Sequence, residues 1–129
     1  MRWLAGMIMV LAAPVAAQEV DCAKAEAQLD LNLCAEQEWK EADVALNSAY
    51  KAARALMQQI DADLPEEERG AEAKLRDGQR AWVTFRDANC AAEGYLMHGG
   101  SAEPMVIFGC LTRLTQTRTN DLQLLVEGD

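Results

Sequence analysis

Four cysteines carry the clearest chemistry in this chain of 129 residues. Cys22, Cys34, Cys90 and Cys110 are an even set, which in a small exported protein is typical of two disulfide bonds. Four cysteines allow three pairings. The alternative is a zinc site, but the chain has no Cys-x-x-Cys pair and His98 is its only histidine. We therefore expect disulfides, and neither a bound metal nor another cofactor.

The first 17 residues have the pattern of a signal peptide. Arg2 precedes an uncharged apolar run, and small residues lead to a cleavage site after Ala17. The run is shorter than the roughly 20 apolar residues of a membrane-spanning helix, and no lipid-attachment cysteine follows it. We expect residues 18–129 to be one periplasmic or secreted domain without a membrane anchor. The alternative is an N-terminal core helix.

The charge of the chain indicates which partners suit it. The formal net charge is -9, and without Arg2 the 11 basic and 21 acidic residues that remain give -10. Nucleic acids and anionic membranes attract Lys and Arg, so neither is an expected partner. A cationic protein fits better.

Stretches rich in Ala, Glu, Gln, Lys and Leu lack strand-like alternation and predict helices over about 35–62, 70–93 and 106–126. Connections around Pro65 and from Gly94 to Pro104 separate them. The predicted fold is an all-α, antiparallel three-helix bundle stapled by two disulfides, with a short extra N-terminal helix from Cys22 to about Asp30 capped by Asp21. Three apolar stripes would form the core: Trp39, Ala42, Leu46, Tyr50, Ala53, Met57 and Ile60; Ala71, Leu75, Gly78, Trp82, Phe85 and Asn89; Ile107, Leu111, Leu114, Arg118, Leu122 and Leu125.

If Cys90 and Cys110 pair, folding the helices back at these connections gathers Cys34, Cys90 and Cys110 at one end of the bundle, which Cys22 can also reach. We favour Cys22–Cys34 and Cys90–Cys110. Twelve residues of continuous helix span roughly 18 Å, whereas bridged Cα atoms lie within about 7 Å. The first pair therefore requires a bend, which we expect between Ala27 and Leu33.

The same register places Asp43 opposite Arg86, as part of a polar network on the apolar faces. A half-buried carboxylate needs such a partner, because burying an unpaired charge is costly. We interpret the network as structural, fixing helix register. A polar pocket or an acid–base site is the alternative.

The remaining members of the network fall in one layer of the bundle. We expect the Arg118 guanidinium to lie over the Trp82 indole. The other groups near it are Tyr50, Asn47 and Gln79, which supply hydroxyl and amide partners.

The connection between the second and third helices is the candidate surface for contact with a partner. A loop tied at its base by Cys90–Cys110 would lose less entropy on binding than a free one. A plain interhelical connection is the alternative. The candidate contact segment runs from Tyr95 to Met105. The residues within it that we favour as contacts are Tyr95, Met97, His98, Gly99, Gly100, Ser101 and Glu103.

Catalysis is not expected from these residue types. His98 stands near Ser101, but no rigid element presents a catalytic triad. The sequence also lacks a Gly-rich phosphate-binding motif and metal-ligand spacing.

Four motifs occur together in the chain: Cys22…Cys34-Ala35; Asp43-x-x-Leu46-Asn47-x-x-Tyr50; Gln79-Arg80-Ala81-Trp82-x-x-Phe85-Arg86-x-x-x-Cys90; and Cys110-Leu111-x-x-Leu114-Thr115-x-x-Arg118-x-x-x-Leu122. With these motifs the chain resembles the lysozyme-inhibitor LprI N-terminal domain family. The resemblance implies a small exported helical domain that binds another protein, with a cationic lysozyme-like muramidase as the partner to be inhibited. A non-inhibitory cell-envelope adaptor or chaperone-like module is the alternative.

Overall fold

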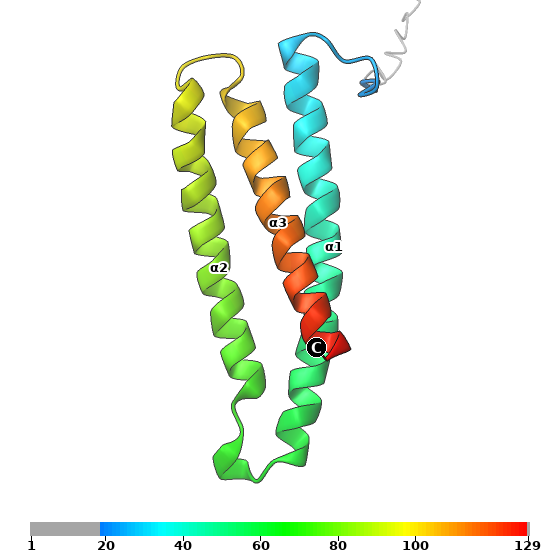
Figure 1. Cartoon of the computed structure of the whole chain (residues 1–129), viewed down its shortest axis with the longest axis vertical. Helices are drawn as coiled ribbons and strands as arrows, with labels where there is room; N and C mark the ends of the chain where they lie inside the picture. The colour runs from blue at the N-terminus through cyan, green and yellow to red at the C-terminus, as the bar shows by residue number, and fades with distance from the viewer. Residues whose placement is uncertain (1–18, 129) are drawn as a thin grey trace, which may run out of the picture.

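The computed structural model describes residues 19–128, which fold into three long helices (Figure 1). The predicted all-α antiparallel three-helix bundle with two disulfides is confirmed. The predicted signal peptide lies outside the described residues. None of the helices over residues 19–128 is both long and apolar enough to span a membrane. In chain order the elements are α1 (Gln28–Asp63), the 3₁₀ turn η1 (Glu66–Glu68), α2 (Ala71–Gly94), the 3₁₀ turn η2 (Tyr95–Met97) and α3 (Glu103–Glu127).

The N-terminal segment differs from its prediction. α1 begins at Gln28 instead of about residue 35, and no separate helix precedes it among the described residues. Asp21 caps a turn and not a helix, because its Oδ1 accepts the Ala23 N–H at 3.1 Å. The predicted bend between Ala27 and Leu33 is also wrong, since α1 runs through 28–33 and the chain turns back before it.

Both favoured disulfide pairings are confirmed. Cys22–Cys34 joins the turn segment to α1 with its Cα atoms 5.6 Å apart, and Cys90–Cys110 joins α2 to α3 with its Cα atoms 5.4 Å apart. The first is reached without breaking α1 because the non-helical residues before Gln28 fold back along it. Both bonds lie in the half of the bundle where α2 passes into α3.

Two clusters of buried side chains form the core. One packs small and branched side chains of α1 against Leu122 of α3, with Leu75 and Trp82 partly buried beside them. The alanines of this cluster let α1 and α3 approach closely. The other surrounds Cys90–Cys110 and includes Leu111, with Trp39 and Phe108 packed against it. The α1 members of the first cluster are Leu46, Ala49 and Ala53.

The inner face of α2 differs from the predicted stripe. Phe85 is 57% exposed, and the buried positions of α2 are Arg86, Cys90 and Gly94 in steps of four. A stripe through 82, 86 and 90 rotates Phe85 outwards. Gly94 permits close packing, because a Cβ there would lie 2.6 Å from Cγ1 of Ile107 on α3.

α3 is shorter than α1 and ends before the turn between α1 and α2 (Figure 1). The lower parts of α1 and α2 therefore extend past the C-terminal end of α3 as a two-helix hairpin. The two ends of the bundle consequently present different surfaces.

Candidate functional site

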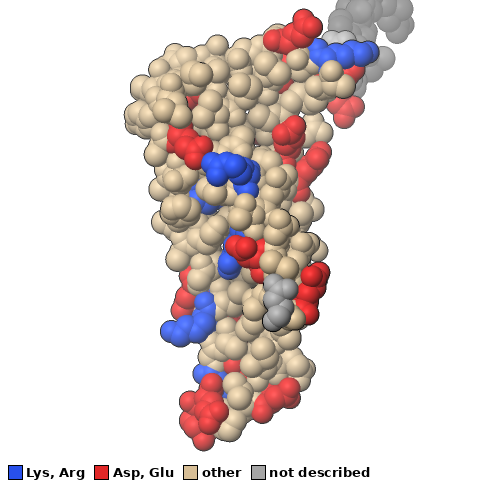
Figure 2. Space-filling model, viewed as in Figure 1, with Lys and Arg blue, Asp and Glu red and all other residues tan. Residues whose placement is uncertain are grey.

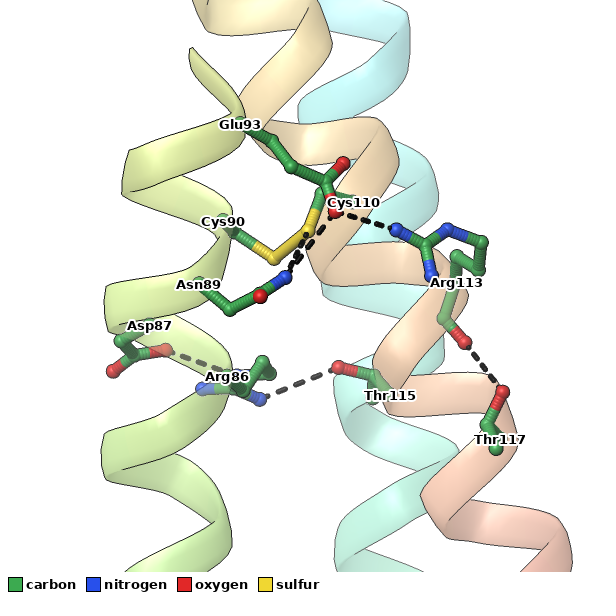
Figure 3. The surroundings of a disulfide bond; sticks show 9 residues. All are labelled: Arg86, Asp87, Asn89, Cys90, Glu93, Cys110, Arg113, Thr115 and Thr117. Carbon is green, nitrogen blue, oxygen red and sulfur yellow. Dashed lines mark hydrogen bonds and ion pairs between the residues drawn. A yellow bond between two sulfur atoms is a disulfide. The ribbon is translucent and has the colours of Figure 1, made fainter. Parts of the chain in front are cut away.

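The predicted polar network is built around Arg86, whose side chain is buried at 8% exposure. Its Nη1 lies 3.5 Å from Asp43 Oδ1 and donates to Thr115 Oγ1 at 3.3 Å, while its Nε bonds Asp87 Oδ1 at 2.9 Å. Figure 3 shows the guanidinium pointing from α2 towards Thr115 on α3. These contacts join all three helices. They pair the positive charge of Arg86 with the carboxylates of Asp43 and Asp87.

Two indole rings enclose the same guanidinium. Arg86 Cζ lies 5.0 Å from the centroid of Trp82 and 6.0 Å from that of Trp39. We predicted that the Arg118 guanidinium lies over the Trp82 ring, and this prediction is wrong. Arg86 is one turn from Trp82 on the same helix, whereas the Arg118 Nε donates to Gln79 Oε1 at 3.0 Å. Trp39 was predicted as a core residue, and its cation–π contact was missed.

The other members of the network lie around it without forming a catalytic arrangement. Asn47 Nδ2 donates to Asp43 Oδ2 at 3.4 Å, which orients the carboxylate from its own helix. Tyr50 packs against the Leu46 cluster. The network as a whole is suited to fixing the positions of the helices.

The end of α2 is held to α3 by more than a covalent bond (Figure 3). Asn89 Nδ2 contacts Cys110 Sγ at 3.7 Å and donates to Glu93 Oε1 at 3.2 Å. Arg113 of α3 donates to the same Glu93 oxygen at 2.8 Å. These contacts fix the base of the predicted contact loop.

The loop begins with an exposed apolar turn, Tyr95–Met97, which we call the apolar tip. Tyr95, Leu96 and Met97 are 68%, 81% and 50% exposed. Leu96 is the most exposed of the three and lies within the predicted contact segment.

Glu103, at the start of α3, holds the rest of the loop. Its Oε2 accepts the Gly99 N–H at 2.9 Å and its Oε1 lies 3.3 Å from His98 Nδ1. The hydrogen bond from Gly99, followed by that from His98, lowers the pKa of Glu103. Gly99 adopts a φ of 76°, which favours glycine.

Further contacts join the loop to its surroundings. The Tyr95 and His98 rings stack with their centroids 4.6 Å apart. Asn32 of α1 donates to the Ser101 carbonyl at 2.9 Å, and the Gly100 N–H bonds the Met97 carbonyl at 2.9 Å. The structure thus brings the predicted loop residues together as one braced unit.

Two observations bear on the chemistry predicted for this unit. Over residues 19–128, no hydrogen bond joins the Ser101 side chain to His98. The same residues contain no group of three or more His, Cys, Asp or Glu side chains placed to hold a metal ion.

Comparisons with known proteins match this fold and sequence. A family model described as "Lysozyme inhibitor LprI" matches residues 21–122. An uncharacterised protein of Rhizobium meliloti (strain 1021) is 42% identical over 127 residues, covering 95% of this chain and 91% of that protein. The crystal structure of a DUF1311 family protein from Pseudomonas putida KT2440 superposes with a TM-score of 0.67. The superposition covers 82% of this chain and 98% of the Pseudomonas putida chain at 22% sequence identity, which shows a shared fold.

Proposed function

We propose that this chain, which belongs to the lysozyme inhibitor LprI family, is an exported protein that binds and inhibits a lysozyme-like muramidase by direct contact. The family supplies the class of partner. The observation that carries the proposal is the apolar tip, which exposes three large side chains to solvent at the cross-linked end of the bundle.

The composition of the tip is that of a binding surface. Tyr and Met are enriched in protein interfaces, and burying apolar surface contributes roughly 25 cal/mol per Å². Figure 2 shows that the end of the molecule where α2 passes into α3 is largely free of charged side chains. A partner could cover this end without desolvating many charges.

The bracing of the tip lowers the entropic cost of binding. Cys90–Cys110 closes its base, Glu103 bonds two residues within the loop, and Asn32 ties the loop to α1. Side chains that are already positioned lose less freedom when a partner arrives. The tip is therefore better suited to recognition than an unrestrained connection would be.

The charge of the chain favours a basic partner. A net charge of -9 accelerates encounter with a cationic protein, and this effect weakens as salt screens it. Export is supported by the two disulfides, which persist in oxidising compartments, and by the predicted signal peptide.

Inhibition of a panel of basic lysozymes by the purified, oxidised protein tests the proposal. We expect inhibition that is stronger at low salt than at physiological salt. Leu96→Ser should weaken it at least about tenfold, as the loss of a central apolar contact does.

Val44→Ser is the matched control, because Val44 is 70% exposed on α1 outside the loop. It should leave inhibition unchanged. Absence of binding to every lysozyme at low salt would reject the proposal. Cross-linking in the native envelope that instead recovers a different protein would support the adaptor alternative.

A further inference from the structure

A second candidate site lies between α1 and α2, away from the apolar tip. It is an open groove of about 610 Å³ in the part of the bundle near the α1–α2 turn. We call it the cationic groove. Its main lining residues are Tyr50 and Arg54 of α1, and Arg76, Gln79, Arg80 and Val83 of α2.

Three arginines make the groove positive in an acidic protein. Arg76 and Arg80 are one turn apart on the same face of α2, and Arg54 approaches from α1. Figure 2 shows basic side chains along the lower part of the α2 edge, above the acidic turn. No carboxylate lines the groove itself.

Neighbouring carboxylates offset only part of this charge. Glu72 lies 2.8 Å from Arg54 Nε and 3.8 Å from Arg76 Nη1, and Asp77 lies 3.6 Å from Arg76 Nε. Arg80 has no carboxylate partner among the ion pairs of residues 19–128. Its guanidinium therefore remains available to a ligand.

The polar wall of the groove also presents a donor. Gln79 Oε1 accepts the Arg118 Nε at 3.0 Å, so its acceptor is already used. No hydrogen bond of residues 19–128 uses the NH₂ group of the same amide, and Gln79 lines the groove. Arg118 thereby sets the polarity of Gln79 from outside the site, and Tyr50 adds a phenol hydroxyl.

We propose that the cationic groove binds a small organic polyanion through oxyanion groups, with Arg54 and Arg80 as the principal ligands. Guanidinium groups bind carboxylates and phosphates through paired N–H donors, and the two side chains reach the groove from opposite helices. Val83 provides an apolar wall for the carbon part of the ligand. The inference does not depend on muramidase binding.

Calorimetric titration of the full, oxidised protein tests the site. Citrate and pyrophosphate serve as probes of the two oxyanion classes, and acetate serves as a monovalent comparison. We expect saturable 1:1 binding of citrate or pyrophosphate that is tighter than that of acetate. The tighter probe identifies the ligand as a carboxylate or a phosphate.

Variants separate a specific site from general charge attraction. Arg54→Gln and Arg80→Gln should each raise the Kd about tenfold, the cost of one charge-assisted contact. Arg113→Gln, which removes an exposed arginine paired with Glu93, should leave the Kd unchanged. Thermal melts should show that all three variants remain folded, since each side chain is exposed.

Two results would overturn the inference. One is the absence of saturable binding with both citrate and pyrophosphate. The other is an equal weakening by Arg113→Gln, which would indicate an adventitious ion only.

Discussion

At one end of the bundle two disulfides fix the chain, and the loop between α2 and α3 projects the apolar side chains of Tyr95–Met97. At the other end the turn between α1 and α2 has no covalent link, and Asp61 holds it. Asp61 Oδ1 accepts the N–H groups of Gly70 and Ala71 at 2.8 Å each, and its Oδ2 accepts that of Glu72 at 3.0 Å. A carboxylate from α1 thus caps the N-terminus of α2, where Gly70 has no side chain to do so.

The two ends therefore differ in how the chain is held and in which side chains they expose. Cross-links at the first end allow it to expose apolar surface and remain folded, because the closed loop restricts the unfolded chain. The second end relies on hydrogen bonds and ion pairs, and its 3₁₀ turn exposes the charged side chains of Glu66–Glu68. The variants below test each end in turn.

Removal of the Cys90–Cys110 bond should have the largest effect. The bond closes a loop with a sequence separation of 20, and losing such a constraint costs about 3 kcal/mol of unfolding free energy. Urea denaturation of a Cys90→Ser/Cys110→Ser double variant measures this.

The matched comparison is Cys22→Ser/Cys34→Ser. Loss of this bond frees the residues before Gln28 in the folded state as well as in the unfolded state. Because both states gain conformational entropy, the effect on the free energy of unfolding partly cancels. We expect a smaller loss. Equal losses of unfolding free energy in the two double variants would show that the α2–α3 disulfide stabilises the bundle no more than the N-terminal disulfide does.

Arg86→Ala should cause the second largest loss of unfolding free energy. It empties the space between Trp39 and Trp82 and leaves Asp43 and Asp87 without their buried cation. We expect a loss of about 2 kcal/mol in urea denaturation. Arg80→Ala, an exposed arginine on the same helix, is the control, and a similar loss in both variants would contradict a central role for Arg86.

Asp61→Asn should loosen the opposite end and do so in a pH-dependent way. The backbone N–H groups of Gly70, Glu72 and Ala71 lower the pKa of Asp61 below its ordinary value of 3.8. Its contribution to stability is therefore complete above that value and is lost as the pH falls through the lower pKa of the folded state.

Thermal melts and amide exchange at residues 70–72 measure this effect. The variant should melt below the parent protein near pH 6, and the difference should shrink below about pH 4. Asp63→Asn is the control, because the Asp63 carboxylate bonds only the Gln59 side chain among the described contacts. A difference that stays constant with pH would contradict the capping role.

Asp43→Ala should have the smallest effect. Asp43 is partly exposed and lies 3.5 Å from Arg86, so its loss should cost about 0.5 kcal/mol. Glu41→Ala, which removes only a bond to Gln37 on the same helix, is the reference. Unchanged stability relative to that reference would reject a stabilising pair between α1 and α2.

Much of the fold follows from sequence because periodicity and connection length determine it. Steps of three and four residues locate the helices, and folding them back at Pro65 and at Gly94–Pro104 brings Cys90 to Cys110. The same register places Asp43 beside Arg86. These relations depend on helix geometry more than on the details of side-chain packing.

Other features depend on packing that a single sequence does not specify. Phe85 and Arg86 are adjacent, and only the neighbouring helices decide which one faces inwards. The start of α1 at Gln28 lacks a Gly or Pro marker. Asp61 was missed because its capping role requires the turn to bring α2 back to it.

The loop that carries the apolar tip was predicted from sequence, whereas its conformation was not. The connection after Gly94 was evident as a loop tied by cysteines. The 3₁₀ turn that exposes Leu96 arises from local hydrogen bonds, including that from the His98 N–H to the Tyr95 carbonyl at 3.2 Å. The cationic groove was not predicted, since it combines residues of two helices.

Hydrogen exchange of the oxidised protein, with and without a saturating basic lysozyme from the inhibition panel, tests the roles of the two ends most directly. We expect slowed exchange in residues 95–103 and unchanged exchange around Asp61 and residues 70–80. Protection confined to the α1–α2 end, with the apolar tip unchanged, would contradict the assignment of recognition to the cross-linked end.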